Sequence, residues 1–441
     1  MEGISVIGIG KLGLCMAACF AAKGYRVIGV DANPVTIQSV NQGKSPIYEP
    51  GLAELMKGLP EPLSATDDYK YAIENSEITF IVVPTPSEED GSFSTKYVEM
   101  ALRDIATNLK HKHDFHVVVL TSTILPGVTD NVAKPLLERI SGKRCGVDFG
   151  LCYNPEFIAL GSVLRDFANP DVVLIGESDQ KSGELLSEIY QVVCDNHPPI
   201  VRSTIYNAEL AKISLNAFIT MKISFANTIA EICERIPGGD ADVVSKILGF
   251  DSRIGRKYLT GGISYGGPCF PRDNKAFSSF ARKIGCKARL SEATDKVNKE
   301  QINRIIYLLR QKLGKVKGKK ISILGLTYKP NTEVIEESAS IEIAKALVRK
   351  GAIVAVYDPA GMGNAKGALG EGVKYASSVR QCLEDAELAI LAVPWDEFKN
   401  LEPQDFIETM RRPRLLDCWK VFDRSEFSQR LEYFAIGLSP T

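Results

Sequence analysis

The sequence has no excess of charge of either sign. Its 441 residues include 53 Lys and Arg and 54 Asp and Glu, which gives a formal net charge of -1. Proteins that bind nucleic acid or an anionic membrane surface usually carry a basic excess or a basic cluster. We therefore expect no nucleic acid and no membrane among the partners of this protein.

Paired cysteines and long apolar runs are also missing. The ten cysteines stand singly, without a C-x-x-C pair, which indicates reduced thiols and predicts neither a disulfide framework nor a metal site. The most apolar stretch, residues 4–22, is interrupted by Lys11 and three glycines and lacks a basic leader. Since no segment is long and apolar enough to span a bilayer, we expect a cytoplasmic protein.

The length of the chain exceeds what one hydrophobic core supports, so two or three domains are expected. Short β-rich runs alternate with helical periodicity through the first half, which predicts βαβ units and a parallel sheet. These runs lie at residues 4–9, 27–30, 78–83, 117–121, 150–153 and 172–175. Long helices are predicted at residues 207–236 and 291–313, and new β-rich runs at residues 321–324, 353–357 and 389–393.

The predicted fold class is therefore α/β, with two Rossmann-like parallel-sheet domains joined by a central helical segment. The first domain covers residues 1–200 and is expected to bind NAD. The helical segment covers residues 201–314, and the last domain covers residues 315–441.

A G-x-G-x-x-G motif follows the first β-rich run. It is formed by Gly8, Gly10 and Gly13, with Lys11 and Leu12 inside it. Between a strand and a helix, such glycines permit a tight turn, close approach of a pyrophosphate and close packing of the helix. The helix amino end then stabilises the phosphates through its N–H groups and its dipole. A plain strand-to-helix turn is the alternative interpretation.

The residue that ends the second β-rich run supports the dinucleotide interpretation. Asp31 lies about 18 residues after Gly13, where a carboxylate accepts hydrogen bonds from ribose hydroxyls. Because Asp31 would repel a 2′-phosphate and no arginine follows it closely, the predicted cofactor is NAD rather than NADP. The run at residues 321–324 lacks the full motif, so we predict no second dinucleotide site.

One cysteine, Cys269, follows the glycines Gly266 and Gly267 and precedes a predicted helix. The amino end of a helix and a nearby base lower the pKa of a thiol and favour the thiolate, which attacks carbonyl carbon. Asp273 lies four residues further on and would share a helical face with Cys269. A small buried hydrophobic side chain is the alternative role for this cysteine.

Three more polar residues stand in apolar surroundings. Lys212 and Asn216 are four residues apart in a helical stretch, so both project from one face. Glu156 follows the run at residues 150–153, at the carboxyl end of a strand, where ligands gather in open α/β sheets. These positions predict a site with Glu156 as general base. A solvated lysine and a helix-capping carboxylate are the alternatives.

Together these segments resemble the UDP-glucose/GDP-mannose dehydrogenase family over nearly the whole chain. The matching stretches are residues 8–13, 45–52, 84–86, 122–123, 154–157, 251–255, 266–273 and 326–331, with Lys212 and Asn216. The resemblance implies NAD-dependent oxidation of C6 of a nucleotide-diphosphate sugar from alcohol to acid, with two hydrides passing to two NAD molecules in succession.

The resemblance also implies roles for single residues. Cys269 adds to the C6 aldehyde as a thiohemiacetal and leaves a thioester that water hydrolyses. Lys212 and Asn216 stabilise the oxyanion, and Glu156 activates the water. Asp273 and Thr123 hold a water and the reacting hydroxyl, while Thr85 and Thr123 contact the cofactor. The implied substrate contacts are Glu156, Phe157, Lys212, Asn216, Arg253, Tyr258, Tyr265, Gly266 and Lys329.

In the family, the equivalent of Arg253 comes from a neighbouring subunit, so the resemblance implies a homodimer or a higher homo-oligomer with the middle helices at the interface. Tyr258 and Tyr265 could equally be packing aromatics. The chain departs from the family pattern at Leu160, where relatives have a glutamate, and at Glu336 and Trp419, where they have arginines. Arginine presents a planar fork to oxygen acceptors that neither glutamate nor tryptophan can replace.

These departures leave the substrate open. UDP-glucose is the first expectation, and UDP-N-acetylhexosamine, GDP-mannose and TDP-glucose are alternatives. A two-electron β-hydroxyacid-type dehydrogenase with a structural Cys269 is the second candidate function, and an inactive homologue that binds a sugar nucleotide is the third.

Overall fold

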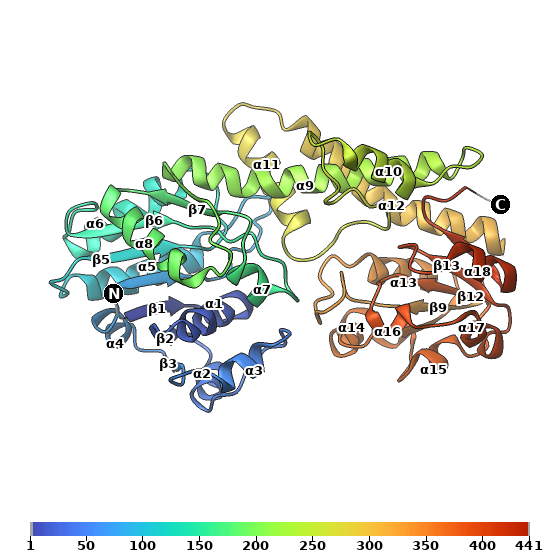
Figure 1. Ribbon diagram of the computed structural model, residues 1–441, viewed down its shortest axis with the longest axis horizontal. Helices are drawn as coiled ribbons and strands as arrows, with labels where there is room; N and C mark the ends of the chain where they lie inside the picture. Colours follow the sequence, from blue (N-terminus) through green and yellow to red (C-terminus); the bar gives the residue numbers. More distant parts are fainter. Residues whose placement is uncertain (1–2, 440–441) are drawn as a thin grey trace. The chain divides into compact units, whose positions relative to one another are not determined.

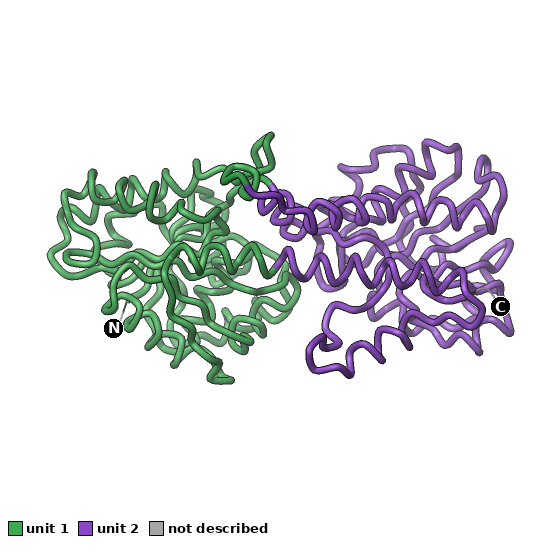
Figure 2. The backbone as a smooth tube through the Cα atoms, turned by 90° about the horizontal axis from the view of Figure 1, so that it is seen from above, with its two compact units in different colours: residues 1–215, 279–285 green, residues 216–278, 286–441 purple. Residues whose placement is uncertain are grey.

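The chain forms two compact units in the computed structural model, which describes residues 3–439 (Figure 2). The first unit runs to Leu215 and includes Ser279–Gly285, and the second takes in Asn216–Ser278 and the chain from Cys286 onward. Each unit contains one β-sheet, with helices on both of its faces (Figure 1). The predicted fold class is confirmed, whereas the three-part division of the chain stays a prediction.

The first unit contains an eight-stranded sheet in the order β3-β2-β1-β4-β5-β6-β7-β8. Its strands are β1 (Gly3–Ile7), β2 (Arg26–Val30), β3 (Ser64–Thr66), β4 (Ile78–Ile81), β5 (His116–Leu120), β6 (Phe149–Tyr153), β7 (Val173–Glu177) and β8 (Ile200–Ser203). Its helices are α1 (Lys11–Ala22), α2 (Pro34–Asn41), α3 (Leu52–Lys57), α4 (Tyr69–Glu74), α5 (Lys96–Leu109), α6 (Lys134–Ser141), α7 (Val163–Ala168) and α8 (Gln180–Val193), with a π-helical turn at Thr129–Ala133.

The last two strands of this sheet, β7 and β8, differ from the prediction of a parallel sheet. β7 pairs antiparallel to β6, with Cys152 opposite Glu177 and Tyr153 opposite Gly176. β8 pairs parallel to β7, so the last two strands run opposite to the other six.

The second unit contains a six-stranded parallel sheet in the order β11-β10-β9-β12-β13-β14, which repeats the order of the first six strands of the other sheet. Its strands are β9 (Lys320–Leu324), β10 (Ile353–Tyr357), β11 (Lys374–Tyr375), β12 (Leu388–Leu391), β13 (Arg414–Asp417) and β14 (Glu432–Ala435). Its helices are α10 (Ala241–Phe250), α12 (Arg289–Leu313), α13 (Ala339–Arg349), α14 (Met362–Leu369), α15 (Val379–Leu383), α16 (Asp396–Lys399), α17 (Pro403–Thr409) and α18 (Arg424–Arg430), with a 3-10 turn at Gly370–Gly372.

Two further helices, α9 (Ile205–Cys233) and α11 (Phe270–Lys283), carry residues of both units. The long stretch without glycine or proline predicted α9, and its 29 residues form one continuous helix. No helix within residues 3–439 is both long enough and apolar enough to cross a membrane.

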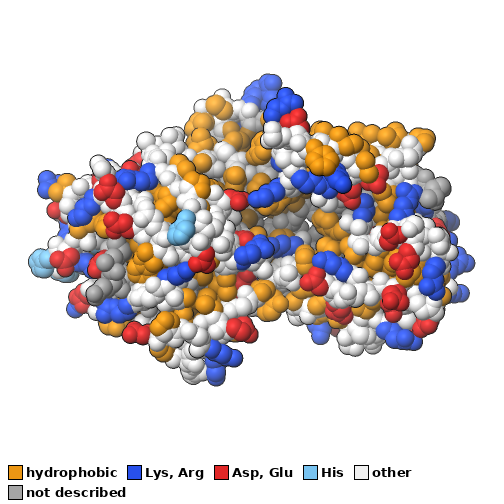
Figure 3. Space-filling model, viewed as in Figure 1, with side chains coloured by type: hydrophobic (Ala, Val, Ile, Leu, Met, Phe, Trp, Pro, Cys, Tyr) orange, Lys and Arg blue, Asp and Glu red, His pale blue; other side chains and the backbone are white. Residues whose placement is uncertain are grey.

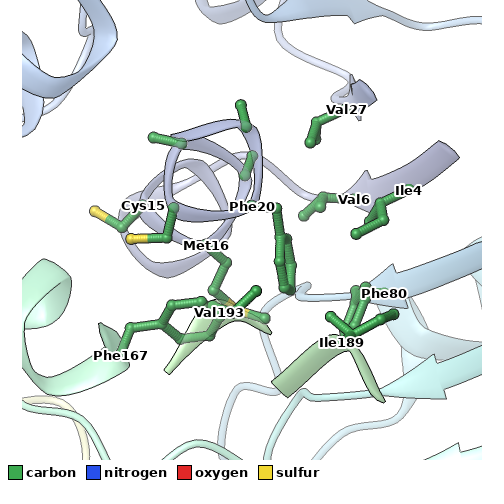
Figure 4. Close-up of a cluster of buried hydrophobic side chains, with 14 of the residues drawn as sticks. Ile4, Val6, Cys15, Met16, Phe20, Val27, Phe80, Phe167, Ile189 and Val193 are labelled. Carbon is green, nitrogen blue, oxygen red and sulfur yellow. The ribbon is translucent and has the colours of Figure 1, made fainter. Parts of the chain in front are cut away.

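The core of the first unit fixes helix α1 against the sheet. Phe20 of α1 packs against Phe80 of β4, with ring centres 5.0 Å apart, and edge-on against Phe167 of α7 at 5.4 Å (Figure 4). Every residue from Gly13 to Ala21 is buried, so α1 is enclosed on all sides rather than amphipathic. Its amino end, which carries the glycine motif, is thereby held at the carboxyl end of β1.

A buried polar network connects neighbouring strands of the same sheet. His116 Nε2 is 2.7 Å from Thr79 Oγ1, and its Nδ1 is 3.1 Å from the carbonyl oxygen of Ser76. Because that carbonyl can only accept, Nδ1 carries the proton and the ring is neutral. Burial, followed by the charge of Lys112, lowers the pKa of His116 to about 3.

This histidine predicts a loss of stability in acid. Since the unfolded chain takes up a proton at His116 near pH 6.5 and the folded chain only near pH 3, the free energy of unfolding falls as the pH drops between these values, by up to about 4–5 kcal/mol. We expect His116→Gln to flatten this slope in urea titrations from pH 7 to pH 4. The exposed His113→Gln is the control, and equal slopes for the two variants would contradict the assignment.

Candidate active site

The glycine motif of the first unit lies at the amino end of α1. Gly8 has a φ of 88°, and a Cβ there would lie 2.4 Å from the carbonyl oxygen of Val82. A Cβ on Gly13 would lie 2.0 Å from the carbonyl oxygen of Gly8. A Cβ on Gly10, in contrast, would meet nothing within 4 Å, and no side chain caps the helix there. The fold thus requires two of the glycines, and the open surface at Gly10 fits a pyrophosphate.

Asp31 follows β2 and turns toward the same loop. Its Oδ2 accepts a hydrogen bond from Ile9 N at 3.1 Å, and its Oδ1 accepts one from Asn33 N at 2.8 Å. Each oxygen keeps a further lone pair for a ribose hydroxyl. Lys11 and Leu12, the other predicted residues, form the first turn of α1. This set fits the pyrophosphate and one ribose of NAD.

Two alanine variants separate the structural from the binding glycines. Gly13→Ala forces two backbone segments apart, so we expect a loss of about 1–3 kcal/mol in the free energy of unfolding. Gly10→Ala keeps its stability but loses about ten-fold in NADH affinity, because its methyl group occupies the surface that the pyrophosphate approaches. Thermal unfolding and NADH fluorescence titration measure the two effects. Normal NADH binding by Gly10→Ala would exclude this surface as the cofactor site.

Thr85 and Thr123 lie after β4 and β5, next to the strand where the sheet order reverses. Thr85 Oγ1 donates a hydrogen bond to the carbonyl oxygen of Thr123 at 2.8 Å. Ser122 Oγ binds the backbone N–H and carbonyl of Val83 at 2.9 and 2.8 Å. In open α/β sheets, ligands bind at the carboxyl ends of strands where the order reverses. Both threonines therefore share the edge of the sheet that carries the glycine motif.

Glu156 belongs to a polar cluster beyond β6. The hydroxyl of Tyr190, from α8, lies 2.7 Å from Glu156 Oε1 and 2.5 Å from Asn154 Oδ1. Burial raises the pKa of Glu156 to about 7, while the Tyr190 hydroxyl and the charge of Lys212 act in the opposite direction. A carboxyl group that titrates near neutral pH suits a general base.

Lys212 joins this cluster from α9. Its Nζ donates a hydrogen bond to the carbonyl oxygen of Glu156 at 2.7 Å and lies 5.2 Å from the centre of the Phe157 ring. Lys212 is buried, so it is not the solvated surface lysine that the sequence left possible. Asn216 follows four residues later on the same helix, one turn further along.

Two buried carboxylates that the sequence analysis missed hold loops near these residues. On α9, Glu209 accepts hydrogen bonds from Gly127 N at 2.6 Å and from Thr129 N and Oγ1 at 2.9 and 2.7 Å. Glu49 accepts hydrogen bonds from Gly161 N and Val163 N, both at 2.8 Å. Their partners lie 80 to 114 residues away, so no local pattern indicates them.

Glu49 helps to explain how the chain accommodates Leu160, where relatives have a glutamate. It accepts hydrogen bonds from the N–H groups of Gly161 and Val163, just after Leu160, and the leucine side chain packs against the hydrophobic core of the first unit. An apolar residue at this place is therefore compatible with an ordered loop after Glu156.

In the second unit, Cys269 immediately precedes α11 and is exposed. Its carbonyl oxygen accepts a hydrogen bond from Asp273 N at 2.8 Å, which closes the first turn of the helix. The alternative of a buried cysteine is wrong. A thiol at this position lies at the positive end of a helix dipole.

The loop before Cys269 packs directly on a neighbouring segment. A Cβ on Gly266 would lie 2.2 Å from the carbonyl oxygen of Glu337, and one on Gly267 would lie 2.6 Å from the Tyr328 ring. Gly267 N also donates a hydrogen bond to the carbonyl oxygen of Glu336 at 2.9 Å. The two glycines therefore let the loop approach this segment, and Glu336 contributes its backbone to that contact.

Asp273 and Asn216 form a buried pair. Asn216 Nδ2 donates a hydrogen bond to Asp273 Oδ2 at 2.7 Å, and the other oxygen of Asp273 pairs with Arg272 at 3.0 Å. Asp273 is 1% exposed. Because its carboxylate fixes the amide nitrogen, the carbonyl of the Asn216 amide and its remaining N–H keep one orientation.

The loop of residues 251–267 carries the predicted substrate residues Arg253, Tyr258, Tyr265 and Gly266. Arg253 is exposed and pairs with Asp251 at 2.6 Å. Tyr258 and Tyr265 each meet the Phe270 ring edge-on, with centres 6.4 and 6.2 Å apart. Both tyrosines thus have a packing role. The side-chain partner of Arg253 among the described residues is Asp251, which is not one of the predicted site residues.

In the second unit, the acidic residue that follows β10 forms hydrogen bonds within the fold. Asp358, at the place that matches Asp31, is buried and accepts hydrogen bonds from the backbone of Leu326, Thr327 and Gly361. Its carboxylate is therefore engaged in holding the strand ends together.

Trp419 and Lys329 lie on loops of the second unit. Trp419 Nε1 donates a hydrogen bond to the carbonyl oxygen of Ala392 at 2.8 Å, and a Cβ on Gly262 would lie 2.8 Å from the Trp419 ring. Trp419 is thus a packing residue. Lys329 Nζ lies 5.9 Å from the centre of the Tyr328 ring.

The strand order, the glycine motif and the acid after β2 define an NAD-dependent dehydrogenase of the Rossmann type. Three models of the UDP-glucose/GDP-mannose dehydrogenase family match the chain: the NAD binding domain at residues 2–194, the central domain at residues 206–300 and the UDP binding domain at residues 322–424. The protein belongs to this family, and NAD is confirmed as its cofactor.

Known proteins resemble the chain over nearly its full length. The UDP-glucose 6-dehydrogenase of Haloferax volcanii is 38% identical over 96% of this chain and 98% of its own. The GDP-mannose 6-dehydrogenase of Pseudomonas aeruginosa is 36% identical over 80% of each chain. The solved UDP-glucose dehydrogenase of Pyrobaculum islandicum has a TM-score of 0.90 and 34% identity, covering 99% of this chain and 98% of its own.

Proposed function

We propose that the protein oxidises UDP-glucose to UDP-glucuronate by removing four electrons at C6 of the sugar. The observation that carries this proposal is the exposed Cys269 at the amino end of α11. An oxidation that stops at a carbonyl needs no such nucleophile, whereas one that continues to the acid uses it. The Haloferax and Pyrobaculum relatives are named for UDP-glucose, which favours this sugar over GDP-mannose, for which the Pseudomonas relative is named.

In the proposed mechanism, the C6 alcohol first loses a hydride from carbon and a proton from oxygen and becomes an aldehyde. Cys269 Sγ then bonds to C6 of the aldehyde, and a proton moves to the carbonyl oxygen to give a thiohemiacetal. Loss of a second hydride from C6 and of the hydroxyl proton leaves a thioester, and attack by water breaks the C–S bond and releases the acid and the thiol. NAD, when bound, supplies the hydride acceptor, so each sugar consumes two NAD molecules.

The surrounding residues stabilise charge and move protons. Lys212 and Asn216 donate hydrogen bonds to the oxyanion, and Asp273 orients the Asn216 amide. Glu156 takes the proton of the attacking water, which its pKa of about 7 permits at neutral pH. Thr123 holds the reacting hydroxyl at the sheet edge that carries the cofactor motif.

A panel of nucleotide sugars tests the proposal. UDP-glucose, UDP-N-acetylhexosamine, GDP-mannose and TDP-glucose are each incubated with NAD, and NADH absorbance is followed to completion. We expect UDP-glucose to give the highest kcat/KM and two NADH per sugar. One NADH per sugar would favour the two-electron dehydrogenase, and no NADH from any sugar would favour the inactive homologue.

We also propose a homodimer or a higher homo-oligomer that contacts its partner through the middle helices. Phe218, Phe225 and Ile232 recur every seven residues on α9 and are 58%, 51% and 49% exposed, and Phe250 at the end of α10 is 77% exposed. In Figure 3, apolar side chains gather over α10. A helix face this apolar usually covers a partner, and the seven-residue repeat suits a second copy of the same helix.

We expect Phe218→Glu with Phe225→Glu to convert the assembly to monomers, since two buried carboxylates would face a second copy. Light scattering after size-exclusion chromatography measures the mass. The control is Ile353→Glu, which changes an exposed apolar residue at the start of β10. If Arg253 acts from the neighbouring subunit, the monomer also loses turnover. A double variant that keeps the mass of the wild type would exclude this interface.

A further inference from the structure

The second unit contains a basic cavity of about 220 Å³ that none of the residues discussed above lines. It is formed by α12, α18, β14 and the turn after α9, and Figure 1 shows α12 running beside α18. Four of its lining residues belong to α12: Arg304, Tyr307, Leu308 and Gln311. Their spacing of i, i+3, i+4, i+7 places them on one face of that helix. Its volume lies below the roughly 300–1,000 Å³ of drug-sized pockets, so it suits a small ligand.

The charges around this cavity do not balance. Four cations line it, Arg235, Arg304, Lys312 and Arg424, against one acid, Glu234. Arg304 is 92% buried and pairs with Glu234 at 2.5 Å, which leaves that acid engaged. Within residues 3–439, no carboxylate lies at ion-pair distance from Lys312 or Arg424. The cavity therefore presents two uncompensated cations.

The geometry at these cations indicates which anion they suit. Lys312 Nζ lies 5.1 Å from the centre of the Phe434 ring, and Arg424 donates a hydrogen bond to the carbonyl oxygen of Ser439 at 2.9 Å. Both interactions leave donors unused, because an ammonium has three N–H groups and a guanidinium has five. A phosphate monoester carries a charge of about -1.5 to -2 at neutral pH and offers three acceptor oxygens, so it can pair with both cations, whereas a monocarboxylate neutralises one.

We propose that this cavity binds a small phosphate monoester, with the phosphate held by Lys312 and Arg424 and the organic part lying against Tyr307 and Phe434. A sugar phosphate and a nucleoside monophosphate share this chemistry. The buried pair of Arg304 and Glu234 fixes the wall of the cavity and keeps its shape. None of its lining residues belongs to the glycine motif or to the loop that carries Cys269.

Isothermal titration calorimetry with glucose 6-phosphate and with UMP tests the proposal. It also distinguishes a sugar phosphate from a nucleoside monophosphate as the ligand. We expect at least one of them to bind the wild type and to lose about ten-fold or more in affinity in Lys312→Gln with Arg424→Gln, the scale expected for charge-assisted hydrogen bonds. Both changed residues lie at the surface or near it, and the Tm and NADH affinity of the variant check its fold.

The control is Lys366→Gln, which removes another exposed lysine that lies over an aromatic ring, 5.9 Å from Tyr375, outside the cavity. A second measurement locates the ligand: acetylation of Lys312, followed by mass spectrometry, should slow in its presence, whereas acetylation of Lys366 should not. Equal binding by the wild type and the double variant, or no binding of either compound, would overturn the proposal. Neither result bears on the oxidation of nucleotide sugars, which does not use these residues.

Discussion

Cys269→Ser is expected to lower the rate of uronic acid release by at least about 10³-fold, because a serine hydroxyl at neutral pH forms neither the thiohemiacetal nor the thioester at a useful rate. NADH formation with the nucleotide sugar, measured together with the acid product by chromatography, reports the loss. Binding of NADH should stay unchanged, since the substitution leaves the glycine motif and Asp31 as they are.

The matched control is Cys286→Ser, which replaces the other exposed cysteine of the described chain. The buried cysteines are poor candidates for the nucleophile, because burial raises the pKa of Cys19, Cys194 and Cys382 to about 12. Full turnover by Cys269→Ser would show that the thiol is structural and would favour the two-electron dehydrogenase.

Local sequence patterns predicted the elements that position the cofactor. The first strand, helix α1 and the acid after β2 lie within about 31 residues, and each has its own signal: an apolar run, a glycine spacing and a strand end. The short strands β3 and β11, with three and two residues, carry too little pattern to be recognised. The antiparallel direction of β7 has no signal of its own, because an apolar run predicts a strand but not the direction in which it pairs.

The candidate site was harder to predict because its contacts are tertiary. Spacing on one helix predicted that Lys212 and Asn216 share a face, and the turn before α11 predicted where Cys269 stands. The partner of Glu156 is Tyr190, 34 residues away on α8, and no local pattern links them. A pKa near 7 depends on that contact and on burial, so it follows only from the folded chain.

The raised pKa of Glu156 leads to a prediction about thioester hydrolysis. Glu156→Gln is expected to slow thioester hydrolysis by about 10²–10⁴-fold, since an amide cannot take a proton from water. In the proposed mechanism the two hydride transfers come before hydrolysis and do not use Glu156, so NADH should appear in a rapid burst and then slowly. Mass spectrometry of the quenched enzyme should find the sugar attached to Cys269. The control is Glu188→Gln, an exposed glutamate on α8.

The pH profile tests the same residue without removing it. Because the base acts only as a carboxylate, the rate of hydrolysis in the wild type should rise with pH through about 7 and fall below it. Tyr190→Phe removes the hydrogen bond that favours the charged form, so the pKa of Glu156 should rise and the midpoint should move to higher pH. The burst amplitude should remain, since Tyr190 acts on the base and not on the nucleophile. A midpoint that stays in place, or moves to lower pH, would mean that another group activates the water.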